Sequence, residues 1–143
     1  MGLFKSSKKE VEDVLENVPL FAECSKKEIS LLAGMVEEEE FEADAVLCKE
    51  GESGLGLSIL MEGDVAVSIG GEHRRDMGPG SFFGEIALLD GGPRTATITA
   101  KAPVRVLSIP AWTFNATIES SPELAVKMLR EVCRRVRETD ATK

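Results

Sequence analysis

Two charged residues of one short segment could together bind a phosphorylated ligand. Glu85 and Arg94 lie nine residues apart in the stretch FFGEIALLDGGPRTATITA, which covers residues 82–100. Arg94 directly follows Pro93, whose ring restrains the backbone, and a guanidinium is a planar fork of donors that matches two phosphate oxygens. The segment therefore predicts a site for one phosphate.

The neighbours of these two residues fit the same chemistry. Gly84 permits a close approach of the backbone to a ligand, and residues 86–89 can form one helical turn whose free N–H groups point outward at its start. The Thr95 hydroxyl can donate a further hydrogen bond. Glu85 needs a hydroxyl donor on the same ligand, because a phosphate alone repels a carboxylate. A ribose hydroxyl beside the phosphate meets this requirement.

Helices are expected before this segment. The sequence SKKE occurs at Ser7–Glu10 and again at Ser25–Glu28, and each copy has the spacing of a helix capping box. The first helix should stop before Pro19, and the second should fade at Gly34.

Short apolar runs broken by turn residues predict a β sandwich or barrel between residues 36 and 110. We expect hairpin turns at Gly70-Gly71 and at residues 62–64. The acidic run 37–40 is interpreted as a solvated edge strand in preference to an acidic binding site.

Two helices are expected at the end of the chain. The first, around residues 111–118, should carry Trp112, Phe114 and Ile118 toward the core. The second should begin at Ser121 as N-cap, with Pro122 in its first turn. Its expected apolar stripe is Leu124, Met128, Val132 and Val136, widened by Ala125, Leu129 and Cys133, with Lys127, Arg130, Glu131 and Arg134 opposite.

Composition and charge exclude several classes of function. The chain has 143 residues, is 43% hydrophobic and has no apolar run near the roughly 20 residues of a membrane span, so we expect a soluble, globular protein. The net charge of −8 should repel nucleic acid. The three scattered cysteines predict neither disulfides nor a zinc pair and suit a reducing cytosol. The start matches a myristoylation pattern at Gly2, but we favour an accidental match.

The sequence contains few residues that could support catalysis. His73 is the single histidine, so neither a catalytic triad nor a multi-histidine metal site can be assembled, and the phosphate-binding loop GxxxxGK[ST] is missing from the sequence. We therefore expect no enzyme, no metal and no cofactor besides a ligand.

Residues 83–88, followed by residues 93–97, resemble the phosphate-binding cassette of cyclic nucleotide-binding domains. This family includes the cAMP-binding domains of catabolite activator proteins, cyclic nucleotide-gated channels and protein kinase A regulatory subunits. The likeness covers residues 11–136, including the segments VPLFAECSKKEISLLA, KEGESG and LMEGDVAVS. Taken singly, Arg94 would be a surface charge and Glu85 a helix-start charge. Their combination, within so long a likeness, favours ligand binding.

The resemblance implies a β jelly roll with flanking helices in a single domain, residues 1–143. It assigns residues 1–35 to N-terminal helices, 36–110 to the jelly roll with the cassette at 82–97, and 111–138 to a C-terminal helix pair that acts as a lid. In the implied site, Glu85 accepts from the ribose 2′-hydroxyl, and the N–H groups of Ile86 and Ala87 meet the cyclic phosphate beside Gly84, Arg94 and Thr95. In one departure, Leu55-Gly56-Leu57 replaces a polar position and should make that loop apolar and looser.

The expected ligand is cAMP in preference to cGMP, but the residues leave the base open. Thr95 could bond the 2-amino group of a syn guanine or serve the phosphate alone. Arg135, on the last helix, could stack on the purine, although a solvent-facing charge is the favoured interpretation. Because the sequence ends at Lys143, without room for a DNA-reading motif, we expect a stand-alone receptor that signals to an unidentified effector protein. We expect a monomer, because the apolar stripe of the last helix is needed as a lid. A nucleotide buffer or interaction module without a conformational switch is the alternative.

Overall fold

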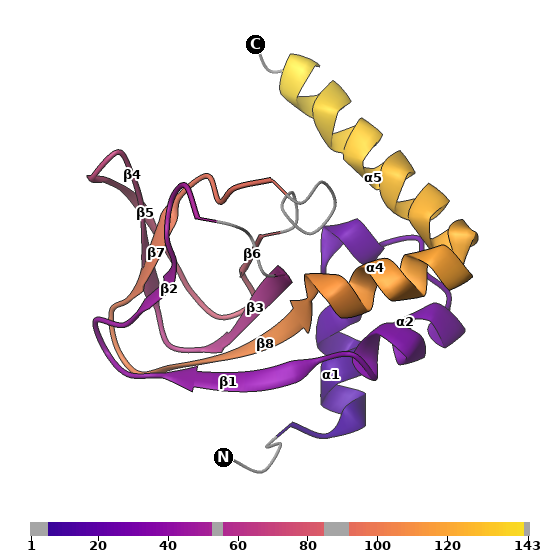
Figure 1. Cartoon of the computed structure of the whole chain (residues 1–143), viewed down its shortest axis with the longest axis horizontal. Helices are drawn as coiled ribbons and strands as arrows, with labels where there is room; N and C mark the ends of the chain where they lie inside the picture. The colour runs from indigo at the N-terminus through magenta and orange to yellow at the C-terminus, as the bar shows by residue number, and fades with distance from the viewer. Residues whose placement is uncertain (1–5, 53–55, 85–91, 142–143) are drawn as a thin grey trace.

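The structure is a computed structural model that describes residues 6–52, 56–84 and 92–141. Figure 1 shows a β region on one side and helices gathered on the other. The strands form two antiparallel sheets of four. The strand order of the first sheet is β1 (Glu37–Phe41), β8 (Val104–Pro110), β3 (Gly56–Glu62) and β6 (Phe82–Phe83). The strand order of the second sheet is β2 (Val46–Cys48), β7 (Thr97–Ala100), β4 (Val65–Ile69) and β5 (Glu72–Met77). The predicted fold class, a β jelly roll with flanking helices, is confirmed.

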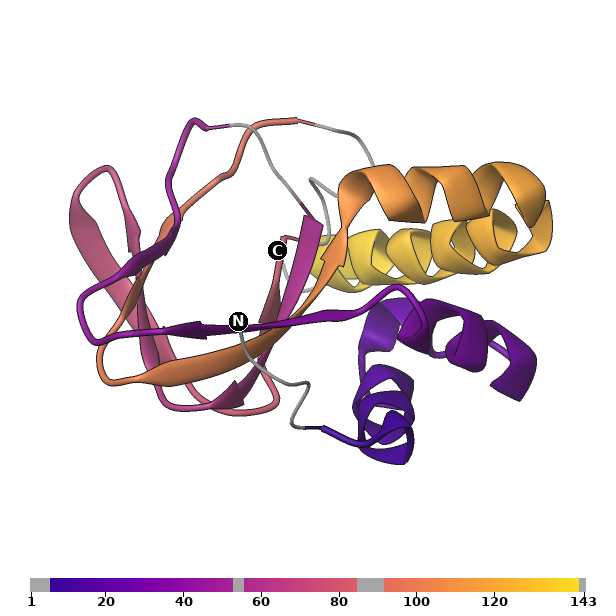
Figure 2. The ribbon, with the colours of Figure 1, turned by 60° about the horizontal axis from the view of Figure 1, so that its bottom comes forward.

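The helical elements are α1 (Lys8–Glu16), the short η1 (Pro19–Phe21), α2 (Lys26–Ala33), α4 (Ala111–Ser120) and α5 (Pro122–Ala141). Figure 2 shows α4 and α5 on the same side of the strands, and Figure 1 shows that α5 diverges from α4 after the turn that connects them. Both predicted capping boxes are present, because the side chains of Ser7 and Ser25 each accept from the N–H of the glutamate three residues later. No helix in the described part of the chain is long and apolar enough to cross a membrane.

Strands β3 and β8 divide the hydrophobic core in two because their side chains alternate between the faces of the sheet. Leu57 and Ile59 of β3 pack with the helices, together with Leu107 of β8. Leu60 and Val106 face the other sheet and pack between the two sheets. The helical layer is therefore joined to the sandwich through the two strands that are buried on both faces.

The two predicted turns and the predicted edge strand have different outcomes. The turn at Gly70-Gly71 connects the paired strands β4 and β5, and both glycines have positive φ, as predicted. The turn at residues 62–64 is not a hairpin, because it connects β3 of one sheet to β4 of the other. Strand β1 lies at a sheet edge, as predicted, but Glu38 in it is only 6% exposed and pairs with Arg105.

The predictions were wrong for Trp112 and for part of the apolar stripe of the last helix. Phe114 is buried and Ile118 packs against the core, but Trp112 is 75% exposed, because α4 buries a single narrow side. In α5, Leu129 and Val136 are 61% and 55% exposed, whereas Glu131 is 4% exposed. The side of α5 that faces the core centres on Leu124 and Met128, and it is set by packing against η1.

Candidate functional site

Two backbone hydrogen bonds fix Arg94 beside the turn that follows β2. Its N–H donates to the carbonyl of Glu52 at 2.8 Å, and its carbonyl accepts from the N–H of Gly51 at 2.9 Å. This pair of bonds joins the turn after β2 to the segment that leads into β7. The arginine side chain therefore leaves from a backbone that is anchored on both sides.

Among the described residues, one of the two terminal nitrogens of the Arg94 guanidinium has a hydrogen-bond acceptor. Its Nη2 donates to the carbonyl of Gly56 at 3.0 Å. Its Nη1 is buried and has no hydrogen-bond partner among the described residues. A buried donor of a charged group without an acceptor is costly, so nearly all such groups in folded proteins have a partner. An anion would provide the missing acceptor.

The guanidinium of Arg94 occupies the space that a side chain at position 84 would fill. A Cβ atom built on this glycine would lie 2.1 Å from Nη1 of Arg94 and 2.4 Å from the carbonyl oxygen of Gly56. Gly84 also has a φ of 91°, a left-handed conformation that favours glycine. The close approach expected at this position is thus made, within the protein, by Arg94.

Gly56 is a site residue that sequence reasoning missed. A Cβ atom there would lie 2.0 Å from the carbonyl oxygen of Ile109, so only glycine brings this backbone close enough for its own carbonyl to accept from Arg94. Gly56 was interpreted as part of a loosened loop. That expectation is wrong for Gly56 and Leu57, which are buried at the start of β3, and Leu55 lies outside the described residues. The glycine at position 56, within the departure at residues 55–57, was the sequence signal that could have indicated a close backbone contact.

A pocket of about 470 Å³ adjoins Arg94. It is lined by residues 46–48 of β2, by Lys49 and Glu52 of the following turn, and by Thr97 of β7. Burial raises the pKa of the Cys48 thiol, against an opposing effect of the nearby Arg94 charge, so Cys48 is a neutral wall of the pocket. The pocket thus combines apolar and charged walls beside the buried donor of Arg94.

The remaining predicted residues have different positions. Thr95 is exposed and does not line this pocket, whereas Thr97 of β7 does line it, and its hydroxyl accepts from the N–H of Glu50 at 3.0 Å. Glu85, Ile86 and Ala87 lie outside the described residues, as does the side chain of Arg135. Their roles stay predictions.

Comparison with known proteins bears on what this site binds. Residues 38–121 match the family model described as the cyclic nucleotide-binding domain. A cyclic nucleotide-gated potassium channel of Rhizobium etli is 37% identical over 108 residues, which cover 76% of this chain and 30% of the channel. The chain thus spans less than a third of that relative.

Solved structures agree with this match. The crystal structure of the N-terminal domain of a transcriptional regulator from Streptomyces coelicolor has a TM-score of 0.81 and 32% identity, covering 92% of this chain and 94% of that one. A co-crystal structure of the regulatory domain of Toxoplasma gondii PKA with cAMP has a TM-score of 0.71 and 33% identity, covering 80% of this chain and 46% of that one.

Proposed function

The chain belongs to the cyclic nucleotide-binding domain family, and from this premise we propose that it is a receptor for a cyclic nucleotide, with cAMP preferred over cGMP. The observation that carries the proposal is the buried Nη1 of Arg94, a charged donor without an acceptor among the described residues. A cyclic phosphate oxygen in front of it would complete the guanidinium, whose other nitrogen already donates to Gly56.

In this proposal the other predicted residues contact the ribose and the remaining phosphate oxygens of the ligand. Glu85 accepts from the ribose 2′-hydroxyl, the N–H groups of Ile86 and Ala87 meet the phosphate, and Thr95 adds a hydroxyl. The preference for cAMP is supported by the cAMP in the Toxoplasma gondii structure, which is 33% identical. A contact of Thr95 with a syn guanine would instead favour cGMP.

Calorimetric titration with cAMP and cGMP tests this function. Arg94→Ala should weaken cAMP binding roughly 10- to 100-fold, because a hydrogen bond to a charged group contributes about 1.5–3 kcal/mol. Arg75→Ala, which removes an exposed arginine of β5, is the control and should bind like the wild type. If wild type binds neither nucleotide below about millimolar concentration, the function is wrong. Equal binding by Arg94→Ala would refute the site alone.

We further propose that ligand binding shifts the positions of α4 and α5, which then signal to an effector protein. Trp112 offers a direct measurement, because it is the single tryptophan, lies on α4 and is 75% exposed. Saturating cAMP should shift its emission to shorter wavelength as α4 and α5 repack. The same titration of Arg94→Ala should leave the emission unchanged at that nucleotide concentration.

The alternative is a nucleotide buffer, which binds without a switch. Binding by calorimetry with no change of Trp112 emission, and no change of the α5 resonances in NMR spectra, would favour the buffer. In either case we propose a binding protein without catalytic activity, located in the cytosol, where Cys24, Cys48 and Cys133 would remain free thiols.

A further inference from the structure

Helix α5 has a second apolar face besides the one that packs on the body of the protein. Leu124 and Met128 are buried and face the core. On the opposite side Val126, Leu129 and Val136 are 45%, 61% and 55% exposed, and Cys133 is exposed with them. We call these four residues the exposed seam.

The exposed seam has the spacing of a coiled coil. Its members follow one another by three, four and three residues, the a and d positions of a heptad repeat. From Cys133 to the end of α5, every residue whose side chain is described is exposed. Figure 1 shows this end of α5 extending away from the rest of the molecule. A partner helix could therefore reach the seam without displacing the core.

Charge beside the exposed seam indicates the kind of partner. Arg130 and Arg137 each follow a seam residue and occupy the e positions of the heptad. Arg130 is 65% exposed and forms one long, solvent-exposed ion pair, with Glu23 at 3.9 Å, which is weak. Arg137 is exposed with no ion pair among the described residues. Arg134 differs, because Glu131 and Glu138 already pair with it. Two cations along the seam thus remain available.

A second copy of the chain would not complement these cations. In a parallel pair, the e position of one helix faces the g position of the other, and the g positions here are the neutral residues Ala125 and Val132. In an antiparallel pair, arginine would face arginine. We therefore propose that α5 binds an amphipathic helix of another protein, with an apolar face that covers the exposed seam and glutamate or aspartate beside Arg130 and Arg137. This proposal does not rest on nucleotide binding.

Two synthetic helical peptides of about three heptads test the proposal. Both carry leucine at a and d; one carries glutamate at e and g, and the other lysine. Titrated against the labelled peptides without nucleotide and followed by fluorescence anisotropy, the full chain should bind the glutamate peptide at least tenfold more tightly than the lysine peptide. The double variant Arg130→Glu, Arg137→Glu should invert this preference.

Single variants distinguish binding at the exposed seam from non-specific hydrophobic binding elsewhere on the surface. Leu129→Asp should weaken binding of the glutamate peptide at least tenfold, with an unchanged circular dichroism spectrum. Leu31→Asp, which changes a leucine of α2 that is 46% exposed, should not alter binding. Undetectable binding, equal binding of both peptides, or an equal loss with Leu31→Asp would overturn the proposal. Sedimentation equilibrium showing a dimer that Leu129→Asp dissociates would also overturn it, in favour of a second copy.

Discussion

Gly84 and Arg94 act as a pair, because the missing side chain of one is the space that the other occupies. Nη1 of Arg94 lies 2.1 Å from the place of a Cβ atom on Gly84. Any larger residue would have to move the guanidinium, and with it the single buried donor that we assign to the phosphate. A substitution of Gly84 should therefore change both the stability of the fold and the affinity for the ligand, and the two effects can be measured separately.

Replacement of Gly84 by alanine should show both effects. The left-handed φ of 91° should destabilise the variant by about 1–2 kcal/mol, measured by urea unfolding, and displacement of Arg94 should weaken cAMP binding at least tenfold. Gly80→Ala is the matched control, because Gly80 has a φ of 94° and open space at its Cβ position. It should lose stability through the strained φ alone, and therefore less than Gly84→Ala, and it should bind cAMP normally. Normal binding by Gly84→Ala would contradict the assigned geometry.

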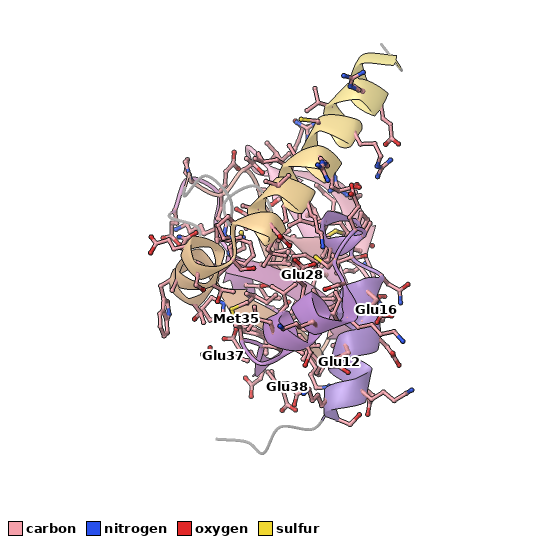
Figure 3. All side chains as sticks on the ribbon, turned by 90° about the vertical axis from the view of Figure 1, so that its right-hand side faces the viewer. Glu12, Glu16, Glu28, Met35, Glu37 and Glu38 are labelled. Carbon is pink, nitrogen blue, oxygen red and sulfur yellow. The ribbon has the colours of Figure 1, made fainter. Side chains whose placement is uncertain are left out.

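At the scale of elements, Glu28 connects two helices that are distant in sequence. Its carboxylate accepts from the N–H of Ser25 at 2.8 Å, which completes the capping box of α2, and from Nζ of Lys127 in α5 at 2.5 Å. Figure 3 shows Glu28 beneath the N-terminal part of α5. The start of α5 is thereby tied to the start of α2.

Glu28→Gln should cost more stability than Glu10→Gln, because Glu10 occupies the same capping position of α1 without a partner from another described helix. Loss of a capping interaction alone should cost about 1 kcal/mol. Urea unfolding at neutral pH measures both variants. Equal losses would show that the bond with Lys127 adds nothing.

The contribution of Glu28 should also depend on pH. Hydrogen bonds, first from Lys127 and then from the Ser25 backbone, lower the pKa of Glu28 from its ordinary 4.5. Because the folded-state pKa is the lower one, the stabilisation is complete above pH 4.5 and is lost as the pH falls through the folded-state value. The stability difference between wild type and Glu28→Gln should shrink over that acidic window. A difference that stays constant there would contradict the assigned pKa direction.

At the scale of the whole molecule, Arg105 joins three strands and the N-terminal segment. From β8 it donates to Glu38 of β1 at 2.7 Å, to Glu62 of β3 at 2.9 Å, and to the hydroxyl of Ser6 at 2.7 Å. The side chain of Arg105 is 14% exposed and that of Glu38 is 6% exposed. Such a sheltered pair should matter far more for stability than a surface pair.

Arg105→Ala should destabilise the protein by about 3 kcal/mol, because it takes the charged partner from a nearly buried carboxylate. Lys101→Ala removes the lysine from an exposed pair with Asp76 and is the control, with little expected change. Thermal and urea unfolding of both variants measure the difference. Similar small losses would mean that the Arg105 network does not hold the N-terminal segment to the sheet.

Features encoded within a few residues could be predicted from the sequence. The capping boxes at Ser7 and Ser25 and the turn at Gly70-Gly71 depend on neighbours one to three positions away, so local patterns were sufficient. The residue types of the segment with Glu85 and Arg94 also predict its chemistry, and the binding roles of both residues stay predictions.

Features that depend on distant packing could not be predicted. The exposure of Trp112 and the burial of Glu131 follow from the side of each helix that meets the body, and periodicity alone does not orient a helix with two apolar faces. The turn at residues 62–64 changes sheets because β3 pairs with β8, which follows more than forty residues later. The sequence determined the starts of α1 and α2 and the turn at Gly70-Gly71, and it predicts a phosphate-binding role for Arg94. Only the tertiary structure decided that Gly56 and Gly84 enclose the guanidinium of Arg94, because that contact joins three segments brought together by folding.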